Sequence, residues 1–116
     1  MREAVDWVAT VAADAIDTDY PSLAKVGEVE VALCRVDDEV FAVGNICTHA
    51  FARLSDGFVE GCEVFCPLHQ GSFDVRTGEP DEIPAITPVK TYPVRIDGER
   101  VLVDVDAPRT IQKENA

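Results

Sequence analysis

Apolar and polar residues alternate over short stretches of this chain, a pattern that predicts β-strands. In residues 29–36 the apolar side chains Val29, Val31 and Leu33 share one face, and a second stretch of strand character follows over 39–43. The pair Asp37-Asp38 separates the two stretches and suits a two-residue turn, so an antiparallel hairpin is predicted. Helical periodicity is weak throughout the chain.

A second hairpin is predicted near the C-terminus, where residues 91–96 and 101–105 flank a turn at Asp97-Gly98. Pro93 has no backbone N–H to donate, so its strand is expected at the edge of a sheet or with that position facing outward. Shorter strands are expected over residues 6–11, 63–65 and 73–75.

Short strands joined by turns predict an all-β fold, a small antiparallel sandwich or barrel. The 116 residues allow a single domain, which we expect over residues 1–106, with a flexible tail over 107–116. The stretch from about residue 45 to residue 88 differs from the rest because it is rich in Gly and Pro and holds both His residues. Such an insertion in a small β domain usually carries the function.

The net charge of the chain limits the kinds of macromolecule that it is expected to bind. Lys and Arg number 10 against 22 Asp and Glu, a formal net charge of −12, so a nucleic-acid partner is not expected and a basic protein surface is favoured. The N-terminus does not resemble a signal peptide, and no apolar run approaches the length of a membrane-spanning helix. We therefore expect a cytoplasmic protein that does not bind membranes. A monomer is the expected oligomeric state, although no sequence pattern indicates it.

Two short motifs in the insertion carry candidate chemistry. Cys47 and His49 stand two residues apart, and Cys66 and His69 stand three residues apart further along the chain. Two thiolates and two imidazoles fit either one tetrahedral Zn²⁺ or a [2Fe–2S] cluster with two Cys on one iron and two His on the other. The Cys-x-His spacing is shorter than that of structural zinc sites, which favours the cluster. Gly57, Gly61 and Gly71 would let the two loops approach closely.

The motif pair and its surroundings resemble the Rieske ferredoxins of bacterial aromatic-ring-hydroxylating dioxygenases. The resemblance rests on Cys-Thr-His, on Arg-Leu-Ser-Asp-Gly at 53–57, on Cys-Pro-Leu-His-Gln-Gly-Ser-Phe-Asp at 66–74 and on Arg-Thr-Gly-Glu-Pro at 76–80. It implies a Rieske fold whose cluster-binding part, about residues 45–88, forms two loops around one [2Fe–2S] cluster. By the same resemblance, the inner iron is bound by Cys47 and Cys66 and the outer iron by His49 and His69.

The resemblance also implies a function. The chain would carry single electrons from an NAD(P)H-dependent flavoprotein reductase to the terminal Rieske oxygenase of an aromatic-hydrocarbon dioxygenase. It would not itself be an enzyme, because both His are committed to the cluster and none is left for a mononuclear iron site. Two alternatives stay open: a Rieske-type small subunit of another redox complex, such as nitrite reductase, and a zinc-stabilised interaction module.

The remaining positions refine this expectation. Respiratory Rieske proteins carry an additional Cys in each loop, where this chain has Ala52 and Leu68, and hydroxyls near the cluster, where it has Gly71 and Phe73. Because hydrogen bonds to sulfur stabilise the reduced state, their loss predicts a reduction potential of about −150 mV. The other two cysteines are not expected to bind the cluster. We expect Cys34 to be a buried apolar residue in its strand and Cys62 to have a structural role.

Overall fold

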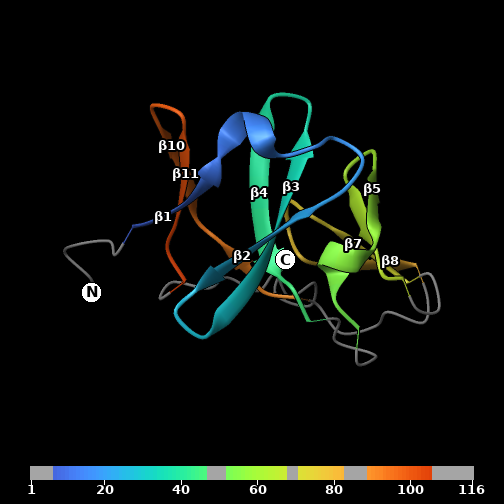
Figure 1. The fold of residues 1–116 in the computed structure, drawn as a ribbon. Coiled ribbons are helices and arrows are strands. Elements are labelled where there is room, and N and C mark those ends of the chain that lie inside the picture. The colour runs from blue at the N-terminus through green and yellow to red at the C-terminus, as the bar shows by residue number, and fades with distance from the viewer. Residues whose placement is uncertain (1–6, 47–51, 68–70, 83–88, 106–116) are drawn as a thin grey trace.

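The computed structural model describes residues 7–46, 52–67, 71–82 and 89–105. Within them the chain forms three antiparallel sheets with two short 3₁₀ turns, η1 (Ala13–Ala15) and η2 (Leu54–Asp56) (Figure 1). The first sheet has the order β1 (Val8–Ala12), β11 (Arg100–Val103), β10 (Val94–Asp97). The second has the order β2 (Ser22–Val26), β3 (Val29–Val36), β4 (Glu39–Gly44), β9 (Thr91–Tyr92). The third has the order β5 (Phe58–Glu60), β6 (Glu63–Phe65), β7 (Ser72–Asp74), β8 (Pro80–Glu82).

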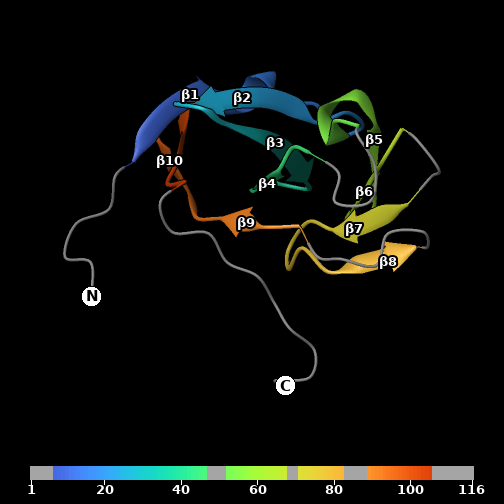
Figure 2. The ribbon, with the colours of Figure 1, turned by 90° about the horizontal axis from the view of Figure 1, so that it is seen from below.

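The all-β prediction is confirmed, and the β3–β4 hairpin lies at the centre of the arrangement. Both views place this hairpin between β10 on one side and the third sheet on the other (Figures 1 and 2). The third sheet is built from the insertion expected at about 45–88. No helix within the described part of the chain is long and apolar enough to cross a membrane.

Strand β3 is a wall shared by two hydrophobic cores. Val31 and Leu33 are buried in the core that β3 shares with β2 and β11, as the alternation predicted. Ala32 and Cys34 point the other way and are buried against the third sheet. The two-sided burial explains why the middle of this strand has no polar residue between its apolar ones.

The predicted β3–β4 turn is confirmed, since Val36 pairs with Glu39. Asp37 adopts a left-handed φ of 55°, a conformation that Asp tolerates better than most residues. The second turn lies one residue later than expected: Asp97 still pairs with Arg100, so the turn is Gly98-Glu99. Gly98 supplies the positive φ of 64° that this turn needs.

Pro93 divides the predicted strand 91–96 into two. β9 before it is the edge of the second sheet, and β10 after it is the edge of the first. The proline therefore lies between two strands, where the chain passes from one sheet to the other. The single strand predicted over 91–96 is wrong, but the expected edge position is confirmed for both strands that flank the proline. Strands β2, β5 and β8 were not expected from the sequence pattern.

Candidate metal centre

The loop that carries the first predicted motif begins at the end of β4 and returns at η2. Of the ligands predicted for it, both Cys47 and His49 lie outside the described residues. The loop's two ends are joined: Ile46 forms an isolated antiparallel bridge with Arg53, and the Leu54 N–H donates to the Asn45 carbonyl oxygen at 2.6 Å. These two contacts therefore hold together the two ends of the loop that carries the first motif.

The second loop connects β6 with β7. Its closing contact runs from the Cys66 N–H to the Gly71 carbonyl oxygen at 2.7 Å, directly beyond the Phe65–Ser72 pair of the ladder. His69 lies outside the described residues, whereas Cys66 lies within them. Its side chain is 1% exposed and belongs to the same core as Leu54, Phe73 and Val75.

Gly57, directly after η2, lies against the end of β6, where the second loop begins. A Cβ atom at this position would overlap the carbonyl oxygen of Phe65, the residue before Cys66. It would also lie 3.3 Å from the Leu54 carbonyl oxygen, which already accepts the Gly57 N–H. The expectation of a close backbone approach is confirmed for Gly57, which places Cys66 beside the return of the first loop. It is wrong for Gly61, where a Cβ would meet nothing within 4 Å and the positive φ of 61° is what favours glycine.

The environment of Cys66 fits a cluster ligand. An apolar, water-poor shell suits an iron–sulfur cluster, because such a shell controls its exposure and potential. The neighbouring hydroxyl of Ser72 is buried and donates to the Glu63 carboxylate at 2.9 Å. The Ser72 hydroxyl therefore donates its proton in a hydrogen bond to the neighbouring strand β6.

The other cysteines in the described residues differ from Cys66. Burial raises the pKa of the Cys34 thiol to about 12, so the thiolate that binds metals is strongly disfavoured there. Cys62 is half-buried in the turn between β5 and β6. No three side chains of His, Cys, Asp or Glu gather closely enough to hold a metal ion among the residues that the structure describes.

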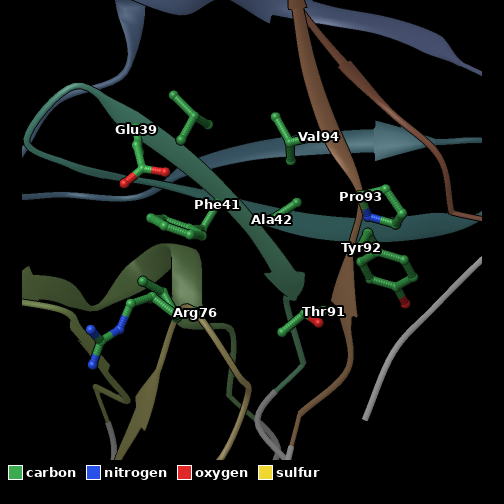
Figure 3. A pocket seen from close by; sticks show the side chains of 10 residues that line it. Glu39, Phe41, Ala42, Arg76, Thr91, Tyr92, Pro93 and Val94 are labelled. Atoms are coloured by element: carbon green, nitrogen blue, oxygen red, sulfur yellow. The ribbon is translucent and has the colours of Figure 1, made fainter. Parts of the chain in front are cut away.

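A separate pocket of about 260 Å³ lies between the start of β4, the turn after β7 and the β9–β10 junction. Arg76 and Glu39 line one side of it with Phe41 between them, and Tyr92 lies on the other side (Figure 3). Arg76 is engaged by Asp74 at 2.8 Å, and this hydrogen bonding holds the pKa of the Asp74 carboxyl below its ordinary value. Cys66, the predicted ligand within the described residues, does not line this pocket.

Asn45 and Glu30 were not among the predicted site residues, although Asn45 begins the first loop and bonds to Glu30. The Asn45 amide is fully buried and bonds both to Glu30 and to the backbone of Ser55. The one available signal was a polar residue between the apolar end of β4 and Ile46. Its partners are ten and fifteen residues away, and periodicity does not reveal such contacts.

Comparison with known proteins agrees with this geometry. The Rieske [2Fe-2S] domain family matches residues 6–93. The ferredoxin component of the naphthalene 1,2-dioxygenase system of Pseudomonas putida is 45% identical over 102 residues, which cover 87% of this chain and 97% of that protein. The ferredoxin of carbazole 1,9a-dioxygenase from Nocardioides aromaticivorans superposes with a TM-score of 0.81 at 39% identity, covering 84% of this chain and 96% of that chain.

Two further solved structures have the same fold, and their descriptions name different redox systems. A chain from the complex of reduced oxygenase and oxidized ferredoxin in carbazole 1,9a-dioxygenase has a TM-score of 0.79 at 31% identity and covers 87% of this chain and 94% of that chain. The structure described as a "putative NADH-dependent nitrite reductase small subunit" from Mycobacterium tuberculosis has a TM-score of 0.76 at 25% identity, and the match covers 95% of this chain and all of that chain. The family match spans more than half of the sequence and agrees with the fold, so the chain belongs to the Rieske [2Fe-2S] family.

Proposed function

We propose that this chain is the ferredoxin component of an aromatic-ring dioxygenase system. It accepts one electron from an NAD(P)H-dependent flavoprotein reductase and passes it to the terminal oxygenase. The observation that carries this proposal is the 45% identity to a naphthalene 1,2-dioxygenase ferredoxin across nearly the whole of that protein. The solved oxygenase–ferredoxin complex supports the oxygenase as partner, whereas the reductase follows from the resemblance of the motifs.

The proposed ligands are Cys47 and Cys66 for the inner iron and His49 and His69 for the outer iron. When bound, a [2Fe–2S] cluster supplies one-electron redox chemistry. The chain's own contribution is to hold the four side chains on two closed loops. For Cys66, the β6–β7 ladder and the backbone bond to Gly71 fix the main chain, and the core excludes water from its side chain.

The hydrogen bonding beside the second loop supports a low reduction potential. Gly71 and Phe73 have no hydroxyl to donate to sulfur, and Ser72 directs its hydroxyl to Glu63. Donors to sulfur stabilise the more negative, reduced form, so their absence favours the oxidised form. The value of about −150 mV stays a prediction.

The nitrite reductase alternative has a specific observation in its favour, because a small subunit of that class covers the whole fold. Its identity of 25% is well below the 45% of the dioxygenase ferredoxin, which we therefore prefer. The cytoplasmic location and the monomeric state are part of the proposal. So is a basic partner surface, which the net charge of −12 favours.

Reconstitution tests this function. Purified reductase and terminal oxygenase of a naphthalene 1,2-dioxygenase system are mixed with NADH, naphthalene and this chain, and the hydroxylated product is measured. Product is expected to depend on the chain and to saturate with it, because the carrier is the only link between reductase and oxygenase. The same chain is added to a nitrite reductase large subunit as the second arm. Nitrite reduction without any ring hydroxylation would overturn the proposal.

A further inference from the structure

Asn45 is a fully buried polar residue at the point where β4 ends and the first loop begins. Its amide nitrogen donates to the Glu30 carboxylate at 3.0 Å, and its amide oxygen accepts the Ser55 N–H at 2.8 Å. Its main chain repeats both links: its N–H donates to the Glu30 carbonyl oxygen at 3.1 Å, and its carbonyl oxygen accepts the Leu54 N–H at 2.6 Å. One residue thus ties β3 to η2 through four hydrogen bonds.

These bonds span the first cluster-binding loop. Asn45 precedes the segment that carries Cys47 and His49, whereas Leu54 and Ser55 follow it. The side-chain bond to Ser55 adds to the backbone closure and satisfies an N–H at the start of η2. The two ends of the loop are therefore fixed to each other and to β3, the shared wall of both cores.

We propose that Asn45 is a positioning residue for the cluster: its amide holds the first loop closed so that the two ligands on it meet the two on the second loop. The inference rests on the proposed function, because it assumes those ligands. Residues behind the ligands hold their geometry, and losing one weakens metal retention about 10- to 100-fold in known sites. Without the amide, the loop ends lose a hydrogen bond that joins them, and the part-buried Ser55 N–H loses its acceptor.

The ion pair beside this amide has a smaller role. Arg53 approaches the same Glu30 oxygen at 3.3 Å, but its side chain is 54% exposed. Exposed ion pairs contribute little, because water screens them. The Glu30→Gln variant removes this charge pairing and keeps an oxygen that can accept from the Asn45 amide. Comparing this variant with Asn45→Ala therefore separates the effect of the hydrogen bond from the effect of the ion pair.

The test compares holoprotein variants by the rate at which an iron chelator bleaches the visible absorbance, and by the EPR spectrum after reduction. Asn45→Ala is expected to lose the cluster about tenfold faster than wild type and to show a changed EPR line shape. Glu30→Gln should stay within about threefold. The matched control is Thr10→Val, which removes a side-chain bond of 2.7 Å to the Val101 carbonyl oxygen in the first sheet and should leave both readouts unchanged.

Wild-type bleaching and an unchanged spectrum in Asn45→Ala would overturn the positioning role, as would equal acceleration in Thr10→Val, which would indicate general destabilisation. If Asn45→Ala does not fold, Glu30→Ala replaces it, because it leaves the Asn45 amide N–H without its acceptor. A wild-type rate in that variant would equally contradict the inference. A wild-type protein without any cluster would instead refute the proposed function itself.

Discussion

Cys66→Ser is expected to yield a colourless protein, with iron content below about a tenth of wild type. Soft thiolates are the ligands that iron–sulfur clusters require, and a serine hydroxyl at neutral pH does not replace one. Cys66 is 1% exposed, so a ligand atom from a surface residue cannot replace its sulfur. Because cluster binding is coupled to folding, the variant should also unfold at lower urea concentration than wild type. Iron analysis and visible absorbance measure the first effect, and urea titration the second.

Cys62→Ser is the matched control, since this cysteine stands four residues earlier and at the opposite end of β6. It should keep the colour and the iron of wild type. Cys66 is also a buried core residue, like Cys34, and the experiment separates this simple role from that of a ligand. A red-brown Cys66→Ser protein with full iron content would mean that Cys66 only packs in the core.

Gly57→Ala is expected to lower the free energy of unfolding by about 3 kcal/mol. The new Cβ would overlap the backbone carbonyl of Phe65, and neither backbone can move without separating the two loops. The loss should exceed that of an ordinary surface substitution, because η2 and the end of β6 are both anchored in the core through Leu54 and Cys66. Urea unfolding followed by circular dichroism measures the change, and iron content reports whether the loops still hold a cluster.

Gly44→Ala provides the comparison, at a glycine that ends β4 in the second sheet. A Cβ at Gly44 would lie 3.9 Å from the nearest atom, the Lys90 carbonyl oxygen, which is ordinary contact. Its stability should equal or slightly exceed that of wild type, because alanine loses less backbone entropy on folding than glycine. If Gly57→Ala were as stable as Gly44→Ala, the close approach of the loops would not matter for the fold.

Local patterns predicted the parts of the molecule that depend on near neighbours. The β3–β4 hairpin follows from alternation and from a turn that Asp37 can adopt. The edge position of the strands that flank Pro93 agrees with its missing N–H. The two Cys/His motifs and the glycine between them pointed to a cluster held by two loops, and the family match confirms the cofactor class.

Other features depend on contacts between distant residues and carry no local signal. Strand β8 (Pro80–Glu82) has no apolar alternation and forms through its pairing with β7. The second buried face of β3 appears once the third sheet covers Ala32 and Cys34. The amide of Asn45 is satisfied by Glu30 and Ser55, whose proximity the fold creates.

A redox titration of the purified wild-type protein, followed by EPR and combined with iron and sulfide analysis, tests the central claim most directly. That claim is a one-electron carrier with one [2Fe–2S] cluster held by two Cys and two His. The account predicts two iron and two sulfide per chain and a single one-electron transition at about −150 mV. A colourless protein with one zinc per chain, or a clearly positive potential, would contradict it.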